Sequence, residues 1–400
     1  MKTNVLDSSP ASIRRPLALN ARTICAGLAL SCATIGYLVM AFGWRQGALF
    51  LVGIGAGLVL YHAAFGFTSA WRDVVRTGRG AGLRAQMLML AVTATVFLPL
   101  LADGQVLGLE LRGAVRPLNV SVLVGAFLFG VGMQLGGGCA SGTLYTAGGG
   151  SVRMVVTLGA FIFGSVLGAF HLPVWQQAPG LGPVSLLAEF GVVGAITISL
   201  VLLASVFAGS ALIERRRHGS LSGGRTGASS RAWLHGPWPL MAGALGLAVV
   251  NIATLMLAGR PWGITSGFAL WGSKTVAALG VDVTAWPYWQ SPARAAALEA
   301  SVFADITSVM NFGIILGALT AAGLAGRFAP VWRVPARPLL AAITGGLLLG
   351  YGARIAYGCN IGAYFSGVAS SSLHGWAWFI AAFAGSSIGT RLRPFFGLSN

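Results

Sequence analysis

Long apolar blocks separated by short polar segments make up most of this chain after residue 20. The blocks are about 20 residues long, the length an α-helix needs to cross a hydrocarbon core of roughly 30 Å. The pattern therefore predicts an all-α, polytopic membrane protein with about ten helical spans. The predicted spans are 22–42, 48–70, 86–102, 118–138, 153–172, 186–212, 239–258, 305–325, 339–358 and 375–390.

Composition supports this prediction and narrows the chemistry. Only 9% of the 400 residues are charged, against about 25% in soluble domains, so a water-facing surface of this size could not be covered. The 59 glycines would allow close helix packing and backbone breaks within the membrane. The four cysteines have no CxxC spacing and the five histidines are scattered, so we expect neither a metal site nor a cofactor.

The formal net charge of +17 comes mainly from arginines in short loops between the apolar blocks. Such clustering is typical of cytoplasmic loops, so we expect a lipid bilayer and not a nucleic acid as the partner of this charge. Most of these loops share one side if both termini are cytoplasmic, and the polar residues 1–20 then precede an uncleaved first anchor. The exceptions, on the opposite side, are Arg45, Arg112, Arg116, Arg260 and Arg294.

A basic, Gly/Ser-rich segment, 214–236, separates two membrane halves, 1–213 and 237–400, and we interpret it as a cytosolic linker. The halves share two motifs in the same order. "FGFTSAW" (65–71) resembles "WGITSGF" (262–268), and "GVGMQLGGGCASGTLY" (130–145) resembles "GYGARIAYGCNIGAYF" (350–365). The equivalent pairs are Gly66 with Gly263, Thr68 with Thr265, Gln134 with Arg354, Gly138 with Gly358, Cys139 with Cys359, and Gly142 with Gly362.

The equivalent cysteines end the fourth and ninth predicted spans, which lie an odd number of crossings apart. Their helices would therefore run in opposite directions, which predicts an inverted repeat with broken or re-entrant helices and a site near the midplane. We expect each break to be followed by a half-helix that begins at "ASGT" (140–143) or "SSLHGW" (371–376). Helix N-termini attract anions, so two of them would form a path for a small anion.

Polar and thiol side chains near these breaks are the candidates for substrate binding. A thiol is a weak donor with a soft, polarisable sulfur, which suits a sulfur-bearing substrate. Arg354 within a span would face a cavity or reach the interface, and each hydroxyl or amide could instead join two helices. The candidates are Cys139, Cys359, Arg354, Gln134, Asn360, Ser141, Thr68, Thr265, Ser266 and His374, with Gly66, Gly138, Gly142, Gly263, Gly358 and Gly362 as structural glycines.

Three stretches resemble motifs of the YeeE/YedE family of sulfur-transport proteins. They are "FGFTSAWRD" (65–73), "FGVGMQLGGGCASGTLY" (129–145) and "GCNIGAYFSGVASSSLHGWAWFIAAFAGSSIGTRLRPFFGL" (358–398). The resemblance implies a bacterial inner-membrane importer of thiosulfate or a related small sulfur-containing anion, with Cys139 and Cys359 lining a pseudo-symmetric path. Gly66 departs from the family, because thiosulfate-transporting members have a cysteine there.

Two other functions stay open at this stage. The substrate could be a selenium compound or another sulfur anion, since the first-motif cysteine is absent. The chain could also be a membrane sulfurtransferase that passes a cysteine-bound persulfide to a cytosolic sulfur-carrier protein, for which it would need an activated thiolate. No Walker motif is present, so we do not expect ATP hydrolysis.

Overall fold

The computed structural model describes residues 19–222 and 232–399. Within them, nine helices or broken helices are long and apolar enough to cross a membrane, which confirms a polytopic helical membrane protein. The tenth predicted span corresponds to α16 (Leu373–Leu392), whose 20 residues are also long enough but include more polar side chains.

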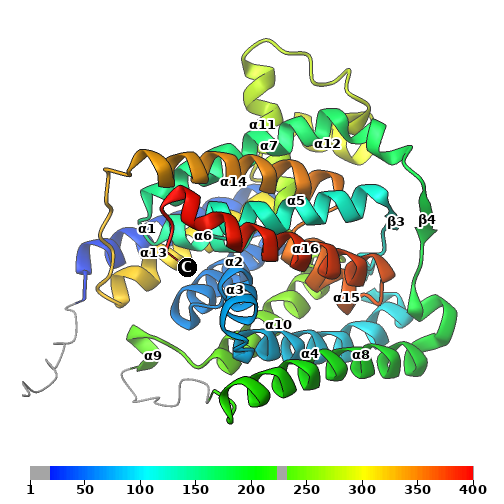
Figure 1. Ribbon diagram of the computed structural model, residues 1–400. Helices are drawn as coiled ribbons and strands as arrows, with labels where there is room; N and C mark the ends of the chain where they lie inside the picture. Colours follow the sequence, from blue (N-terminus) through cyan, green and yellow to red (C-terminus); the bar gives the residue numbers. More distant parts are fainter. Residues whose placement is uncertain (1–18, 223–231, 400) are drawn as a thin grey trace, which may run out of the picture.

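Helices account for most of the described residues, and the strands there form two short antiparallel pairs, β1 with β2 and β3 with β4 (Figure 1). The elements in chain order are α1 (Ala21–Phe42), α2 (Trp44–Ala63), α3 (Phe67–Thr77), α4 (Ala81–Asp103), β1 (Gln105–Val106), β2 (Leu109–Glu110), β3 (Pro117–Asn119), α5 (Val120–Gly136), α6 (Ala140–Gly148), α7 (Val152–Gln176), β4 (Gly180–Pro183), α8 (Leu186–His218), α9 (Ala232–His235), α10 (Leu240–Ala258), α11 (Thr265–Ala278), η1 (Pro287–Trp289), α12 (Pro292–Glu299), α13 (Ile306–Leu324), α14 (Ala336–Ile355), the π-helical turn η2 (Asn360–Phe365), α15 (Ser366–Ala369), α16 (Leu373–Leu392) and η3 (Arg393–Phe396).

One sequence-based prediction about where a helix begins is wrong, and another span is broken inside. The span predicted at 48–70 lies within the candidate span Trp44–Thr77, where Ala64 adopts a left-handed conformation and ends α2 three residues before α3 begins. The half-helix after Cys359 begins at once, at Asn360, and not within "SSLHGW" (371–376), where Leu373 instead begins α16. A hydropathy pattern registers apolar length, and these short backbone irregularities leave that length unchanged.

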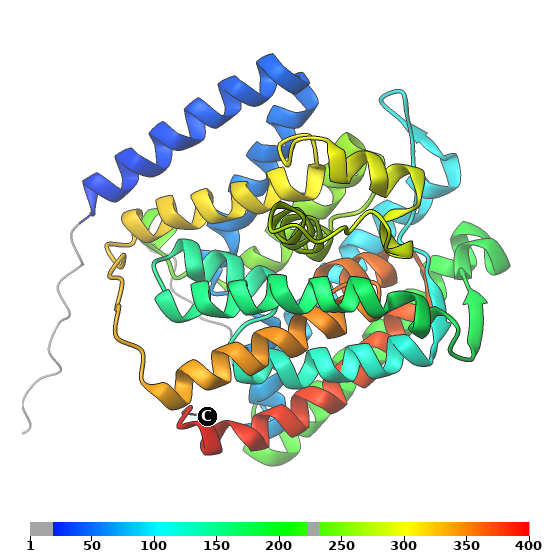
Figure 2. The ribbon, with the colours of Figure 1, turned by 90° about the horizontal axis from the view of Figure 1, so that it is seen from above.

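The packing pairs the helices as a twofold relation between the halves requires. α2 packs against α13, and its counterpart α10 packs against α4; α5 packs against α16, and its counterpart α14 packs against α7. The equivalent helices α5 and α14 also contact each other and run in opposite directions, as the predicted inverted repeat demands (Figures 1 and 2). α1 and α8 lie outside this scheme, at the periphery.

The two ends of the molecule differ in their elements. At one end, called here the linker end, lie the C-terminus, α9 and the end of α8; at the other, the strand end, lie β1–β4 (Figures 1 and 2). α8 continues to His218, inside the segment assigned to the linker, and 223–231 lies outside the described residues, as does 1–18. The division into two halves therefore stays a prediction.

A buried carboxylate ties the end of α8 to the core. Glu214 accepts hydrogen bonds from the Gly80 amide at 3.0 Å, from Arg84 Nη1 at 2.7 Å and from the Ser222 amide at 2.7 Å. Its side chain is fully buried, so the ion pair with Arg84 is shielded from water. These contacts hold Ser222 against the α3–α4 turn.

Candidate functional site

The two equivalent cysteines occupy the same structural position in each half. Each is extended, with ψ of −170° at Cys139 and −169° at Cys359, and directly precedes a short helix, α6 or η2. Both thiols are free and buried, with 2% and 0% exposure. Cys139 Sγ lies 3.3 Å from Ser141 Oγ, and the Cys139 carbonyl accepts from the Thr143 amide at 2.8 Å.

Glycines make these turns possible. A Cβ on Gly138 would lie 3.1 Å from the Gly142 carbonyl carbon, and one on Gly358 would lie 2.8 Å from the Ala363 amide nitrogen. Gly358 also has φ of +157°, at the limit of the region that L-residues avoid. Each glycine thus lets the first turn of the next helix pack directly on the backbone before the thiol.

The structure brings the two cysteine elements together. α6 contacts η2, and both thiols belong to one continuous buried cluster. The first-motif elements join them: a Cβ on Gly362 would lie 3.8 Å from Gly263 Cα, and the Phe67 ring, at the start of α3, lies 6.2 Å from Tyr364. Four helix starts, those of α3, α6, α11 and η2, therefore meet in the core.

The equivalent residues Gln134 and Arg354 donate equivalent hydrogen bonds to backbone carbonyls. Gln134 Nε2 donates to the Thr68 carbonyl at 2.9 Å, and Arg354 Nη2 donates to the Thr265 carbonyl at 2.7 Å. Thr68 and Thr265 are themselves equivalent, so each half uses one long side chain to fix the start of its first-motif helix. That this pair contacts the anion stays a prediction; in the structure Gln134 also donates to Ser386 and Arg354 also donates to Tyr288.

Several buried polar groups at this centre have no partner among the described residues. Both polar side-chain atoms of Asn360, the Tyr364 hydroxyl and Thr68 Oγ1 are unpaired, and so is His374 Nε2, farther away at the start of α16. Asn360 is fully buried and follows Cys359 directly. Groups of this kind carry a desolvation cost of about 1–3 kcal/mol each unless a ligand or water pairs with them.

The other candidates have structural partners. Ser266 Oγ donates to Thr307 Oγ1 at 3.1 Å, and His374 Nδ1 lies 2.7 Å from Ser372 Oγ. Sequence reasoning missed Tyr364, whose ring stacks on Phe379 with centroids 4.9 Å apart. Its position within the shared cysteine motif was the only available signal.

Arg116, Arg260 and Arg294, three of the exceptions to the predicted distribution of arginines, lie close together at the strand end. Burial, together with the neighbouring positive charges of Arg294 and Arg260, lowers the pKa of Arg116. Burial also lowers the pKa of Arg260, an effect that the negative charge of Asp305 partly opposes. Arg260 donates a hydrogen bond to Thr307 Oγ1 at 3.1 Å. Thr307 also accepts a hydrogen bond from Ser266, so the charge of Arg260 lies next to the start of α11.

No group of three or more His, Cys, Asp or Glu side chains able to hold a metal ion occurs in the parts of the chain that the structure describes. The arrangement thus offers thiols, hydroxyls, amides, helix N-termini and nearby guanidinium groups. Together they can bind a small anion through several weak contacts.

Comparison with known proteins agrees with this chemistry. Residues 62–388 match the family model described as "Sulphur transport". The "Thiosulfate transporter TsuA" of Spirochaeta thermophila is 31% identical over 339 residues, which cover 82% of this chain and 92% of that protein. The "Probable transporter YedE" of Escherichia coli is 32% identical over 169 residues, and that match spans only 41% of each chain. The chain therefore belongs to the sulphur transport family.

Proposed function

We propose that this protein imports thiosulfate, or a related small sulfur-containing anion, across the bacterial inner membrane along a path between Cys139 and Cys359. The observation that carries the proposal is the meeting of two short helices, each preceded by a buried free thiol, in the core. The name of the Spirochaeta relative, which aligns over most of both chains, supports this substrate class.

The path would replace the water that a small dianion loses in the membrane. The amides at the starts of α6 and η2 supply partial positive charge, and the thiols can donate S–H groups to the anion. Asn360, unpaired and fully buried, can supply a further donor beside Cys359. Each contact is weak, and several weak contacts let an ion bind and then leave.

The ends of the path would differ in charge. At the strand end, Arg116, Arg260 and Arg294 would attract anions before they enter, since positive charges near a concave site raise the local anion concentration. The linker end has the larger number of arginine-bearing loops, and under the positive-inside bias this end, with both termini, would face the cytoplasm.

The burial of both thiols favours transport over a sulfurtransferase. A persulfide on Cys139 or Cys359 would have to reach a carrier protein, yet these side chains are 2% and 0% exposed. A cytosolic sulfur-carrier protein would instead receive sulfur after release at the linker end. A selenium analogue of the anion would make the same contacts, so it remains a second substrate to test.

Uptake of ³⁵S-thiosulfate into proteoliposomes tests the proposal. Cys139→Ala and Cys359→Ala each remove one donor, worth about 1–2 kcal/mol, so the uptake rate should fall roughly 5–30-fold. Cys25→Ala and Cys32→Ala, at exposed positions on α1, are matched controls and should leave uptake unchanged. Unlabelled sulfite, sulfate and selenite as competitors would rank the substrates. Uptake that survives loss of both buried thiols would contradict the proposed path.

A further inference from the structure

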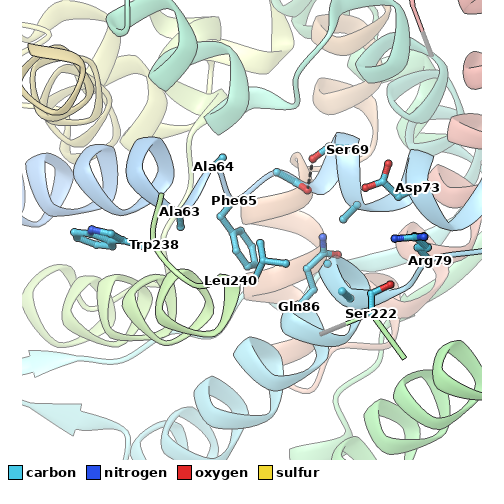
Figure 3. A pocket seen from close by; sticks show the side chains of 14 residues that line it. Ala63, Ala64, Phe65, Ser69, Asp73, Arg79, Gln86, Ser222, Trp238 and Leu240 are labelled. Atoms are coloured by element: carbon cyan, nitrogen blue, oxygen red, sulfur yellow. Dashed lines mark hydrogen bonds between the residues drawn. The ribbon is translucent and has the colours of Figure 1, made fainter. Parts of the chain in front are cut away.

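A cavity of about 360 Å³ opens beside the break between α2 and α3, at the linker end (Figure 3). Its lining includes Gly66, Ser69 and Gln86 in the interior and Asp73, Arg79 and Ser222 toward the linker. Neither the thiols nor the strand-end arginines take part in it. It therefore is a separate space, on the linker-end side of the first motif.

Gln86 supplies an unused donor at the wall of this cavity. Its residue is fully buried, and its Oε1 accepts from Trp71 Nε1 at 2.9 Å, which fixes which end of the amide is the nitrogen. Nε2 then has no partner among the described residues. In Figure 3 the Gln86 amide lies within the group of lining side chains, below Ser69.

The start of α3 contributes to the same wall. Gly66 precedes this 11-residue helix and provides no side-chain cap, so the first amides of α3 are not satisfied by a capping group. Ser69 Oγ donates to the Gly66 carbonyl at a long 3.3 Å and can turn to another acceptor. Arg79 lines the cavity as well, and it forms no ion pair with Asp73 in the described structure.

Ser69 also occupies the space that a side chain at position 66 would need. A Cβ on Gly66 would lie 2.9 Å from Ser69 Oγ, closer than real contacts allow. At this position the cavity wall therefore presents a hydroxyl and an amide. Hydroxyl and amide donors are stronger than a thiol and pair well with oxygen acceptors.

We infer that this cavity is a second anion-binding site, which holds the oxyanion end of the substrate through Gln86, Ser69 and the start of α3 after it leaves the thiols. The inference rests on the proposed function for its substrate, thiosulfate. It differs in its prediction, because the cavity should bind thiosulfate even when both buried thiols are removed. It also assigns Gln86 a role as a binding residue.

Gln86→Glu is the decisive variant, because it keeps an acceptor for Trp71 but removes the amide donors and adds a negative charge. Gln105→Glu, at an exposed position in β1, adds the same charge at the strand end and serves as its control. Titration calorimetry with thiosulfate would use the full-length protein in detergent, in a Cys139→Ala/Cys359→Ala background. We expect binding in that background, weakened at least about tenfold by Gln86→Glu and unaffected by Gln105→Glu.

Ser69→Ala is a second variant that changes no charge and should weaken binding by a smaller factor, about threefold to tenfold. Thermal melting of each variant identifies any that fails to fold, and Ser69→Ala then decides the result alone. Binding that disappears with the two thiols, or that neither Gln86→Glu nor Ser69→Ala weakens, would overturn the inference. Failure of the proposed function has a different result: wild-type proteoliposomes would take up no thiosulfate, whatever binds in the cavity.

Discussion

Replacing Gly142 by alanine would place a methyl group against the Cys139 thiol without disturbing the helix that carries it. The added Cβ would lie 3.6 Å from Cys139 Sγ, an ordinary van der Waals distance, and would meet no other heavy atom outside its own local backbone within 4 Å. Gly142 lies inside α6 and its φ is not positive, so alanine fits the backbone. Only the space beside the sulfur is lost.

The effect on stability and the effect on transport should therefore have opposite signs. Glycine in a helix is less favourable than alanine by about 0.5–1 kcal/mol, so the variant should be equally or slightly more resistant to unfolding. An anion that reaches the thiol from this side would lose its contact, about 1–2 kcal/mol, and uptake should fall roughly 5–30-fold. A destabilised protein would lose both properties together.

The assay combines thermal melting with ³⁵S-thiosulfate uptake by the same preparation in proteoliposomes. Gly159→Ala is the matched control, because the new Cβ in α7 would meet nothing within 4 Å. It should leave the uptake rate unchanged. Its melting temperature should rise by no more than the small gain expected when alanine replaces glycine in a helix. Gly142→Ala protein that melts normally and transports at the wild-type rate would show that the substrate does not approach Cys139 from α6.

Three further substitutions test other contacts. Arg354→Met removes hydrogen bonds to the Thr265 carbonyl and to the Tyr288 hydroxyl, so the free energy of unfolding should fall by about 3 kcal/mol. An unchanged melting temperature would contradict the role of Arg354 in fixing the start of α11. Glu214→Gln breaks the buried pair with Arg84 and should cost about 3–5 kcal/mol, partly recovered when Arg84 is also replaced by methionine; full stability of the single variant would refute this account. Arg260→Gln should slow uptake several-fold at low ionic strength and flatten its salt dependence, whereas an unchanged salt dependence would exclude steering by this charge.

The length of the apolar blocks was enough to predict the spanning helices. The two shared motifs, together with the number of spans between them, predicted that α5 and α14 run in opposite directions. The pairing of equivalent cysteines likewise identified the turns that surround both thiols. Such inferences succeed because bilayer thickness and glycine geometry act on short stretches of sequence. α11, with 14 residues, was not predicted as an element, since it is too short to span a membrane.

The roles of single side chains were harder to predict, because they depend on partners far away in the sequence. Gln134 donates to a carbonyl 66 positions earlier, and nothing near it in the chain reveals that acceptor. Gln86 is an available donor only because Trp71 engages the other end of its amide. Hydropathy registers each of these residues simply as a polar interruption in an apolar block.

The crossed packing of the halves has a consequence for how the protein is made. α5 and α7 enter the bilayer long before the ribosome completes α14, the helix that covers both of them. Until then the glycine-lined faces of the early helices lack their final neighbours, and the bond from Gln134 to Ser386 waits still longer, for α16. The early helices must therefore wait beside the translocon or a chaperone, and neither half synthesised alone should reach a protease-resistant state, whereas co-expression of both should restore it.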